Sequence, residues 1–168
     1  MTGMTHHARD RDRWGPLRGD DGWRFRLWAP EAGTVELMLD DRALPMTRGD
    51  DGFWTAQHPA TPGMRYLFRV DGQAMPDPAS RLQSGGVSDA SVLLQLPAPQ
   101  PWAGRPWHQA VIYQLHVGCF TPEGTFAAAQ ARLAGLAALG FTAIQLMPVG
   151  QFPGSRGWGD DGVLPYAP

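Results

Sequence analysis

The hydrophobic pattern changes its period near residue 100, and this change constrains the fold more than any other feature of the chain. Before it, apolar and polar residues alternate in short runs, which is typical of half-buried strands. After it, apolar runs at 111–117 and 141–148 flank a stretch with helical spacing at 126–139. Strand, helix and strand with short links form a parallel unit whose strands are covered on both faces. The sequence therefore predicts a β-rich module followed by part of an α/β domain.

The first part of the chain contains four predicted strands. The clearest has three apolar residues that alternate with two arginines, so one of its faces is expected to be buried. The four strands are expected at 23–27, 35–39, 53–57 and 65–70. Asp71 and Gly72 are expected to form a hairpin turn, because both residue types tolerate a positive φ. Short strands separated by turns indicate a β-sandwich.

Four segments follow from this pattern. Residues 1–21 are polar and rich in Arg and Asp, and they are predicted to form a flexible N-terminal arm. Residues 22–97 should form the β-sandwich. The proline-rich stretch 98–107 is expected to be a stiff linker, and 108–168 should be the α/β part.

The α/β part is short for the fold that its pattern predicts. Thr125 is expected to cap its helix and Gly140 to end it. A complete (β/α)₈ barrel takes about 250 residues, whereas only 20 residues follow the second predicted strand. We therefore expect a barrel that has only begun. The apolar faces of Leu133, Leu136 and Ile144 should then be exposed and promote aggregation.

Composition excludes several classes of protein. The formal charge is -2 and the basic residues are dispersed, so nucleic acid is not an expected partner. No apolar run approaches the roughly 18 residues of a membrane span, and the polar start lacks a secretory signal, so a cytoplasmic location is expected. The single cysteine, Cys119, excludes an internal disulfide and is expected to be a buried thiol. No phosphate loop or zinc spacing is present, and no metal or cofactor is expected.

Candidate site residues follow from the position of active sites in barrels, at the C-terminal ends of the strands. These ends lead into 116–124 and 149–168, and the second stretch is long, glycine-rich and aromatic. His116 could be a general base or a metal ligand. A hydrogen-bonded structural histidine is the favoured interpretation, because no second ligand lies at a metal-binding spacing.

Asp160 and Asp161 are adjacent carboxylates in the second stretch. Sequence neighbours point in different directions, whereas glycoside hydrolysis needs two carboxyl groups about 5–9.5 Å apart across a sugar. A turn flanked by Gly159 and Gly162 is therefore favoured over acid/base chemistry.

Four strings in the last third carry a resemblance to a known family. They are Val-Ile-Tyr-Gln-Leu-His-Val-Gly (111–118), Phe-Thr-Pro-Glu-Gly-Thr-Phe (120–126), Leu-Gly-Phe-Thr-Ala-Ile-Gln-Leu-Met-Pro-Val (139–149) and Arg-Gly-Trp-Gly-Asp-Asp-Gly-Val (156–163). Together they closely resemble the start of the catalytic barrel in the maltooligosyltrehalose trehalohydrolase family, within the α-amylase superfamily. The β module resembles the immunoglobulin-like N-terminal domain of these enzymes, most clearly at Phe-Arg-Leu-Trp-Ala-Pro (25–30).

The resemblance implies an immunoglobulin-like all-β sandwich followed by the truncated start of an α-amylase-type (β/α)₈ TIM barrel. It implies hydrolysis of the α-1,4 bond next to the trehalosyl end of maltooligosyltrehalose, with retention, by an Asp nucleophile and a Glu acid/base. The family's carboxylates come from later strands, beyond Pro168, so no catalytic residue is assigned here. The isolated chain is therefore expected to be inactive.

The resemblance also implies an α-glucan or maltooligosyltrehalose substrate and places part of its binding surface in this chain. The substrate-binding residues are expected to be His116, Trp158, Gly159, Asp160 and Asp161. The family pattern is Trp-Gly-Tyr-Asp-Gly, in which the Tyr stacks on a sugar. Asp160 occupies the position of that Tyr, which puts the sugar subsite in doubt, while Asp161 matches the family's Asp.

Two alternatives stay open. The chain could be a fragment of a glycogen branching or debranching enzyme, which keeps the same chemistry. It could instead be a non-catalytic α-glucan-binding protein that uses exposed Trp residues of the β module.

Overall fold

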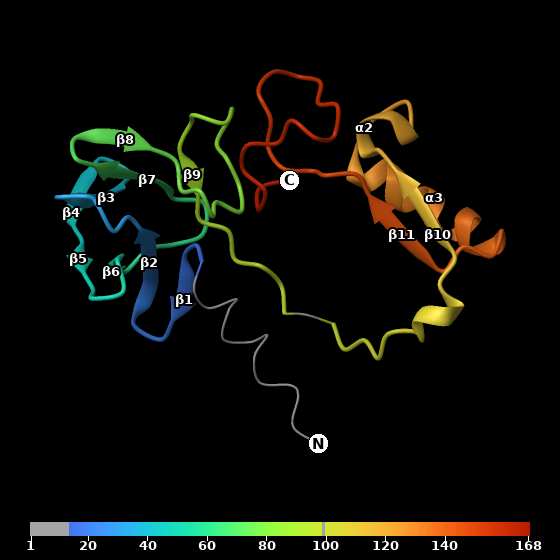
Figure 1. Cartoon of the computed structure of the whole chain (residues 1–168), viewed down its shortest axis with the longest axis horizontal. Helices are drawn as coiled ribbons and strands as arrows, with labels where there is room; N and C mark the ends of the chain where they lie inside the picture. Colours follow the sequence, from blue (N-terminus) through green and yellow to red (C-terminus); the bar gives the residue numbers. More distant parts are fainter. Residues whose placement is uncertain (1–13, 99) are drawn as a thin grey trace. The chain divides into compact units, whose positions relative to one another are not determined.

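The computed structural model describes residues 14–98 and 100–168, which form two compact units (Figure 1). The first unit comprises the described residues up to Leu96 together with Tyr166–Pro168, and the second runs from Pro97 to Pro165. Each unit has its own strands and its own buried side chains.

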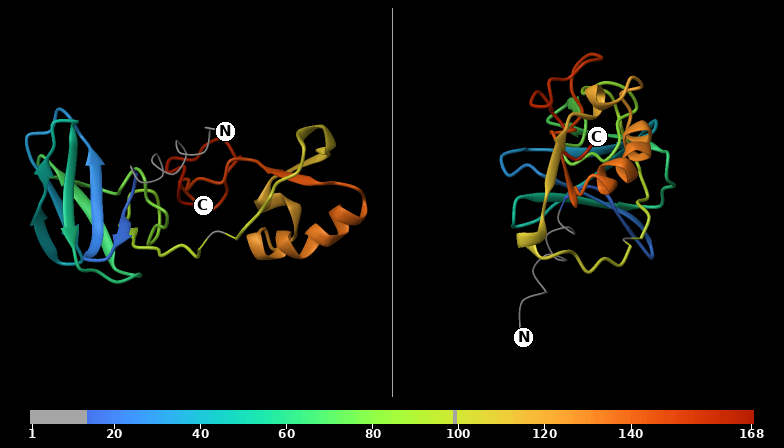
Figure 2. Two further views of the ribbon diagram at one scale, coloured as in Figure 1. Left: turned by 90° about the horizontal axis from the view of Figure 1, so that it is seen from below. Right: turned by 90° about the vertical axis from the view of Figure 1, so that its right-hand side faces the viewer.

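Two antiparallel sheets make up the first unit (Figure 2). One sheet has the strand order β1-β2-β6-β5, and the other has the order β4-β3-β7-β8, with β9 also paired to β7. The strands are β1 (Leu17–Gly19), β2 (Gly22–Trp28), β3 (Val35–Leu39), β4 (Arg42–Pro45), β5 (Thr47–Arg48), β6 (Phe53–His58), β7 (Arg65–Val70), β8 (Gln73–Met75) and β9 (Ser91–Val92). Pairing of β2 with β6 and of β3 with β7 shows that the chain crosses between the two sheets, as it does in a sandwich.

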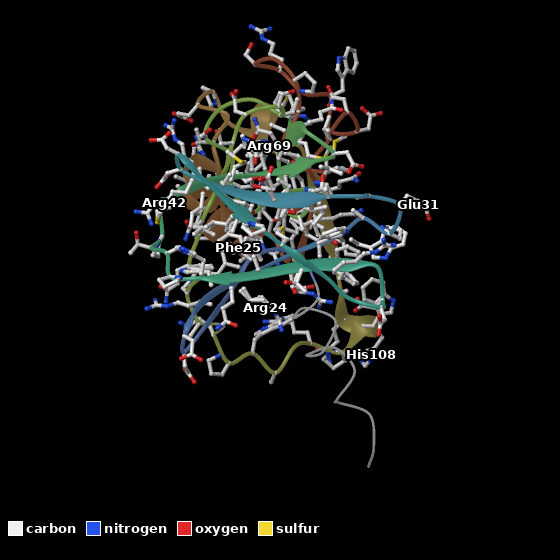
Figure 3. All side chains as sticks on the ribbon, turned by 90° about the vertical axis from the view of Figure 1, so that its left-hand side faces the viewer. Arg24, Phe25, Glu31, Arg42, Arg69 and His108 are labelled. Carbon is white, nitrogen blue, oxygen red and sulfur yellow. The ribbon has the colours of Figure 1, made fainter. Side chains whose placement is uncertain are left out.

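Alternation along the strands places one hydrophobic core between the two sheets. In β2, Phe25 is fully buried, whereas Arg24 is on the outer side of its sheet (Figure 3). Phe25 packs edge-to-face against Tyr66 of β7, with ring centroids 5.4 Å apart, and Tyr66 packs against Phe68 at 6.0 Å. Such aromatic pairs are stabilising beyond the area they bury. The other buried members of this core are Trp23, Leu27, Ala32, Val35, Leu37, Leu39, Met46, Trp54 and Leu93.

The four strands predicted from alternation are present as β2, β3, β6 and β7. The predicted hairpin turn joins β7 to β8, and its residues Asp71 and Gly72 have φ values of 48° and 88°. Alternation does not reveal the five other strands, because each has only two to four residues. One of these, β1, pairs with β2 and lies inside the stretch 1–21 that the sequence predicts to be a flexible arm. The rest of that arm, 1–13, lies outside the described residues.

A buried polar cluster ties the loop between β8 and β9 to the core. Tyr66 donates a hydrogen bond to Asp77 Oδ2 at 2.8 Å, and the backbone N–H of Ala79 donates to Asp77 Oδ1 at 2.8 Å. Ser91 Oγ accepts from the backbone N–H of Asp77 at 3.0 Å. Burial raises the pKa of Asp77 from 3.8 to about 6, although the two donors favour its charged form. Burial, and next the charge of Asp77, raise the pKa of Tyr66 well above 10.0.

The second unit is built on two parallel strands, β10 (Ile112–Leu115) and β11 (Ala143–Leu146), in register from Ile112 opposite Ala143 to Leu115 opposite Leu146. Between them lie the short helix α2 (Val117–Phe120) and the helix α3 (Phe126–Ala138), and the 3₁₀ helix η1 (Trp107–Gln109) precedes β10. The predicted strand, helix and strand are therefore confirmed. No helix in the described part of the chain is long and apolar enough to cross a membrane.

The ends of α3 are those that the sequence predicts. Thr125 has extended backbone, and its side chain accepts a hydrogen bond from the backbone N–H of Ala128 at 3.2 Å. Gly140 has a φ of 95°, and its N–H donates to the carbonyl of Ala137. These bonds satisfy backbone groups that a helix end leaves without partners.

Burial in the second unit is less complete than the apolar runs predict. Ile112 and Leu146 remain 42% exposed, so the strands are not covered on both faces by the described residues. Leu133 is exposed, as expected, whereas Leu136 and Ile144 are half-buried. One helix can cover only one face of a two-stranded sheet, which leaves the other face open.

Cys119 is exposed, so the prediction of a buried thiol is wrong. The residue lies in α2, a helix of 4 residues in which only Val117 is buried. Residues two apart on a helix point to different sides, so Cys119 faces outward where Val117 faces inward.

We expect the free energy of unfolding to fall as the pH rises from about 4 to about 6. In this window the folded chain holds more protons than the unfolded chain, because the pKa of Asp77 is raised from 3.8 to about 6. When Asp77 is fully ionised, this pKa shift lowers the free energy of unfolding by about 3 kcal/mol. Asp77→Asn should remove this part of the pH dependence, since the amide oxygen still accepts a hydrogen bond but does not titrate. Urea unfolding followed by Trp fluorescence at several pH values measures the difference, and equal pH dependence of both chains would contradict it.

We expect this chain to self-associate through the apolar surface around Leu133, and Leu133→Arg to reduce that association. Leu and Arg have similar helix propensities, so the substitution should leave α3 intact. Ala137→Arg on the same helix is the matched control, because it adds the same charge at an exposed position without removing a large apolar side chain. Sedimentation velocity over a concentration series is the measurement. A monomeric, sharply melting wild-type chain would sink the idea.

Candidate functional site

The site residues predicted from the sequence all lie in the second unit, in the segments that follow its two strands. His116 follows β10 directly, and Trp158 to Asp161 lie in the loop after β11. Because β10 and β11 are parallel, their C-terminal ends lie at the same edge of the sheet. The pairing continues one step further, where the N–H of Met147 donates to the carbonyl of Leu115 at 2.9 Å.

His116 contacts the loop rather than standing apart from it. Its Nε2 lies 3.0 Å from the carbonyl oxygen of Gly157, a residue 41 positions further along the chain. A carbonyl oxygen can only accept a hydrogen bond, so Nε2 carries the proton. The favoured interpretation of His116 as a hydrogen-bonded residue is therefore confirmed.

Gly159 is the point of closest approach between the loop and the strand ends. Its φ is 93° and the residue is buried. A β-carbon at this position would lie 3.0 Å from Met147 Cε and 3.2 Å from His116 Cδ2. The positive φ therefore favours glycine here, and the space beside it is tight.

Asp161 closes the turn that contains Trp158. Its Oδ1 accepts a hydrogen bond from the backbone N–H of Trp158 at 3.1 Å. The turn role that the sequence favours for this carboxylate is confirmed. Trp158 is 84% exposed, and Asp160 in the same turn is exposed as well. The turn thus presents a flat aromatic face beside a carboxylate.

The base of the loop is closed by backbone hydrogen bonds. The N–H of Val163 donates to the carbonyl of Gln151 at 2.7 Å, and the N–H of Gln151 donates to that of Leu164 at 3.2 Å. Leu164 is buried at this closure. A loop with paired ends and an internal turn is a compact surface loop of the kind that often carries function.

This arrangement offers an exposed aromatic ring and a neighbouring carboxylate, which are groups that can bind a ligand. The sequence places only three carboxyl residues between 97 and 165, namely Glu123, Asp160 and Asp161. Asp161 is engaged in the turn. The described residues contain no group of three or more His, Cys, Asp or Glu that could hold a metal ion.

A second candidate surface lies on the first unit. The sequence pattern did not identify the residues that form it. Trp28 ends β2, its side chain is 54% exposed, and it lines a hollow together with Glu31, Arg48 and Asp50. Gly52 closes one side, where a β-carbon would lie 3.1 Å from Trp28 Nε1. The signal that could have located it is the alternation in β2, which places Trp28 on the same outer face as Arg24 and Arg26.

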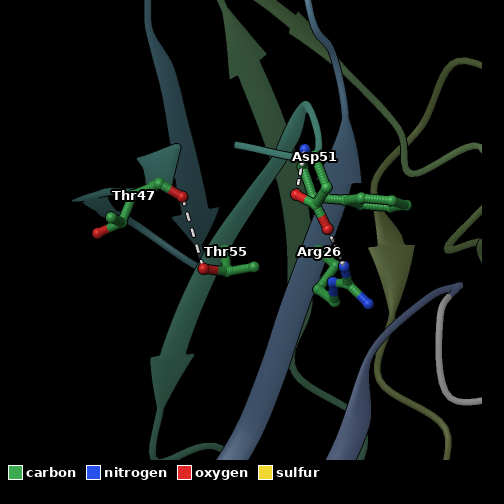
Figure 4. A network of polar contacts seen from close by, with 5 residues as sticks. Arg26, Thr47, Asp51 and Thr55 are labelled. Carbon is green, nitrogen blue, oxygen red and sulfur yellow. Dashed lines mark hydrogen bonds and ion pairs between the residues drawn. The ribbon is translucent and has the colours of Figure 1, made fainter. Parts of the chain in front are cut away.

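Polar side chains on the neighbouring strands make contacts of their own (Figure 4). The guanidinium of Arg26 lies 4.0 Å from the centre of the Phe53 ring and 3.4 Å from Asp51 Oδ2. Asp51 also accepts from the backbone N–H of Phe53 at 3.1 Å, and Thr55 donates to the carbonyl of Thr47 at 3.5 Å. Trp28 is the aromatic residue that lines the hollow.

Comparison with protein families matches residues 9–87 to carbohydrate-binding module 48, described as the isoamylase N-terminal domain. The match covers most of the first unit and includes Trp28.

Comparison with individual proteins extends the similarity along the chain. Over 168 residues the chain is 42% identical to malto-oligosyltrehalose trehalohydrolase of Deinococcus radiodurans, covering 97% of this chain and 28% of that protein. It is 29% identical over 196 residues to 1,4-alpha-glucan branching enzyme GlgB 1 of Xanthomonas axonopodis pv. citri, covering 97% of this chain and 27% of the enzyme. The chain thus spans less than a third of the length of these curated relatives.

Among solved structures, a putative alpha amylase from Salmonella typhimurium superposes with a TM-score of 0.82 at 47% sequence identity. The superposition covers 92% of this chain and 28% of that chain. Both units are therefore included in the similarity.

Proposed function

Because this chain is a relative of the N-terminal part of malto-oligosyltrehalose trehalohydrolases, which are α-amylase-type glycoside hydrolases, we propose that it serves the release of trehalose from maltooligosyltrehalose. The bond cleaved is the α-1,4 bond next to the trehalosyl end. The observation that carries the proposal is the 42% identity over 168 residues, which covers 97% of this chain. Identity to the branching enzyme is lower, at 29%, which favours the trehalose-releasing reaction over branching.

The proposal includes a finer description of the fold. The first unit is proposed to be an immunoglobulin-like sandwich over 22–97, and the second to be the first strands and helix of an α-amylase-type (β/α)₈ barrel over 108–168. Crossing of the chain between two antiparallel sheets supports the first part, and the parallel pairing of β10 and β11 around α3 supports the second. Residues 98–107 are proposed to be the linker and the cytoplasm to be the location.

Within this function, the turn around Trp158 is proposed to bind the glucan. The ring is 84% exposed and its backbone is fixed by Asp161, so it offers a flat apolar face at little cost in conformational entropy. Asp160 next to it can accept hydrogen bonds from sugar hydroxyl groups. The family's stacking tyrosine is replaced by Asp160, so stacking at this turn is left to Trp158.

We predict that the 168-residue chain releases no trehalose from maltooligosyltrehalose by itself. Retaining hydrolysis needs two carboxyl groups about 5–5.5 Å apart across the sugar, and of the three carboxyl residues between 97 and 165, Asp161 is held in the turn. Enzymatic measurement of trehalose after long incubation with the purified chain tests this. Turnover above that of a heat-inactivated sample would refute it.

We predict that Trp158→Ala weakens glucan binding by on the order of tenfold, since the exposed aromatic face is lost. Affinity electrophoresis in gels containing glycogen or starch measures the retardation. Trp107→Ala is the matched control, because Trp107 is 80% exposed and lies in the same unit but outside the loop. Equal retardation of the wild-type chain and Trp158→Ala would count against the proposed surface.

Asp160→Tyr should increase retardation in the same gels, because it restores the aromatic residue of the family pattern at this position.

A second candidate function is supported by the hollow beside Trp28. We propose, as the alternative, that the chain is a non-catalytic α-glucan-binding protein whose β module makes the contact. Matching to a carbohydrate-binding module and the 54% exposure of Trp28 favour this reading. In the same gels Trp28→Ala would then abolish retardation while Trp158→Ala would leave it unchanged, which is the reverse of the first proposal.

A further inference from the structure

The contacts of His116 assign it a role that differs from the sugar contact predicted for it. We infer that His116 is a positioning residue whose Nε2–H holds the carbonyl of Gly157 and thereby fixes the turn that presents Trp158. The inference rests on the proposed function, because that turn is the surface to which the glucan is proposed to bind.

The hydrogen bonds of the imidazole ring support this role. Nε2 is 3.0 Å from the Gly157 oxygen and donates to it. Nδ1 is buried and has no hydrogen-bond partner among the described residues. These two observations assign the ring proton to Nε2. Within the described part of the chain, the bond to Gly157 is then the one polar contact of the His116 side chain.

The packing of the ring supports the same role. On one edge, a β-carbon at position 159 would lie 3.2 Å from His116 Cδ2. On the other edge, a β-carbon at position 118 would lie 3.1 Å from His116 Cε1. The ring therefore sits between two glycines that approach it closely, and its orientation is set by these contacts and by the bond to Gly157.

A direct chemical role fits these contacts less well. A general base needs an unprotonated nitrogen within reach of the substrate, and a metal ligand needs a nitrogen that faces the ion together with further ligands. Nε2 is engaged with Gly157 and Nδ1 is buried. No cluster of metal-binding side chains surrounds His116 in the residues that the structure covers.

The peptide group that joins Gly157 to Trp158 is thus held at both of its polar atoms. His116 holds the carbonyl of Gly157, which precedes Trp158, and Asp161 accepts from the N–H of Trp158 itself. Gly159, which follows Trp158, lies against His116 and Met147. Removing the His116 bond should therefore loosen the turn while the pairing of β10 with β11 persists.

The experiment uses three substitutions in the 168-residue chain. His116→Gln places an amide N–H near the position of Nε2, His116→Asn places one near Nδ1, and His116→Phe fills the ring volume without any donor. Amide hydrogen exchange of Trp158, followed by NMR, reports opening of the turn. The amide of Met147, bonded to Leu115 between the strands, is the internal reference for intact pairing.

We expect His116→Gln to protect the Trp158 amide as the wild-type chain does. In His116→Asn and His116→Phe its exchange should be about tenfold faster, as for the loss of one hydrogen bond, with Met147 unchanged. Nitrogen chemical shifts of the wild-type ring should show the proton on Nε2. Undiminished protection in His116→Asn, or a ring proton on Nδ1, would overturn the inference. If His116→Phe does not fold, the comparison of Gln with Asn decides.

Failure of the proposed function gives a different result. Hydrogen exchange requires no sugar, so the positioning role stands or falls without it. Glycogen gels run on the same variants add the second readout: retardation that follows Trp158 protection supports both proposals. If no chain is retarded while the exchange pattern holds, the glucan proposal fails and the positioning role remains.

Discussion

Tyr66 joins the two kinds of interaction on which the first unit depends. Its ring packs between Phe25 and Phe68 at the centre of the core, and its hydroxyl donates to Asp77 in the loop that follows β8. A buried hydroxyl without an acceptor would be costly, so core packing and loop position are coupled through one side chain. The loop closes over the core with Ser91 of β9 as a further support. The module is therefore held by apolar burial in its interior and by buried hydrogen bonds where the chain leaves the sheets.

In the second unit, strand pairing provides what the candidate site needs. Parallel pairing brings the residues after β10 and after β11 to one edge, so that His116 and Met147 both border Gly159. The loop then needs little structure of its own, because its base is closed by the pairing of Gln151 with Leu164. A rigid support beneath a short exposed turn is the arrangement expected of a binding loop.

The sequence predicts the parts of this structure that depend on side-chain pattern. Alternation locates β2, β3, β6 and β7, and helical spacing with Thr125 and Gly140 locates α3. It does not predict β1 or β5, because edge strands of two or three residues depend on backbone pairing and need no alternation of their own. It also overestimates burial at Ile112, since an apolar residue indicates what a strand would bury, not what is present to cover it. For the site, the sequence names His116 and the glycine-rich loop, but the bond between His116 and Gly157 spans 41 residues and depends on the fold.

The loop separates the residues that hold its shape from those that face outward. Gly157, Gly159 and Asp161 are committed to contacts within the protein, and Trp158 and Asp160 alternate with them as exposed side chains. Substitutions at the exposed positions can therefore alter the surface that the turn presents without altering its backbone. The same frame could display a tyrosine, an aspartate or another residue at position 160. The outward-facing chemistry of this turn is in that sense interchangeable, while the backbone geometry that displays it is constant.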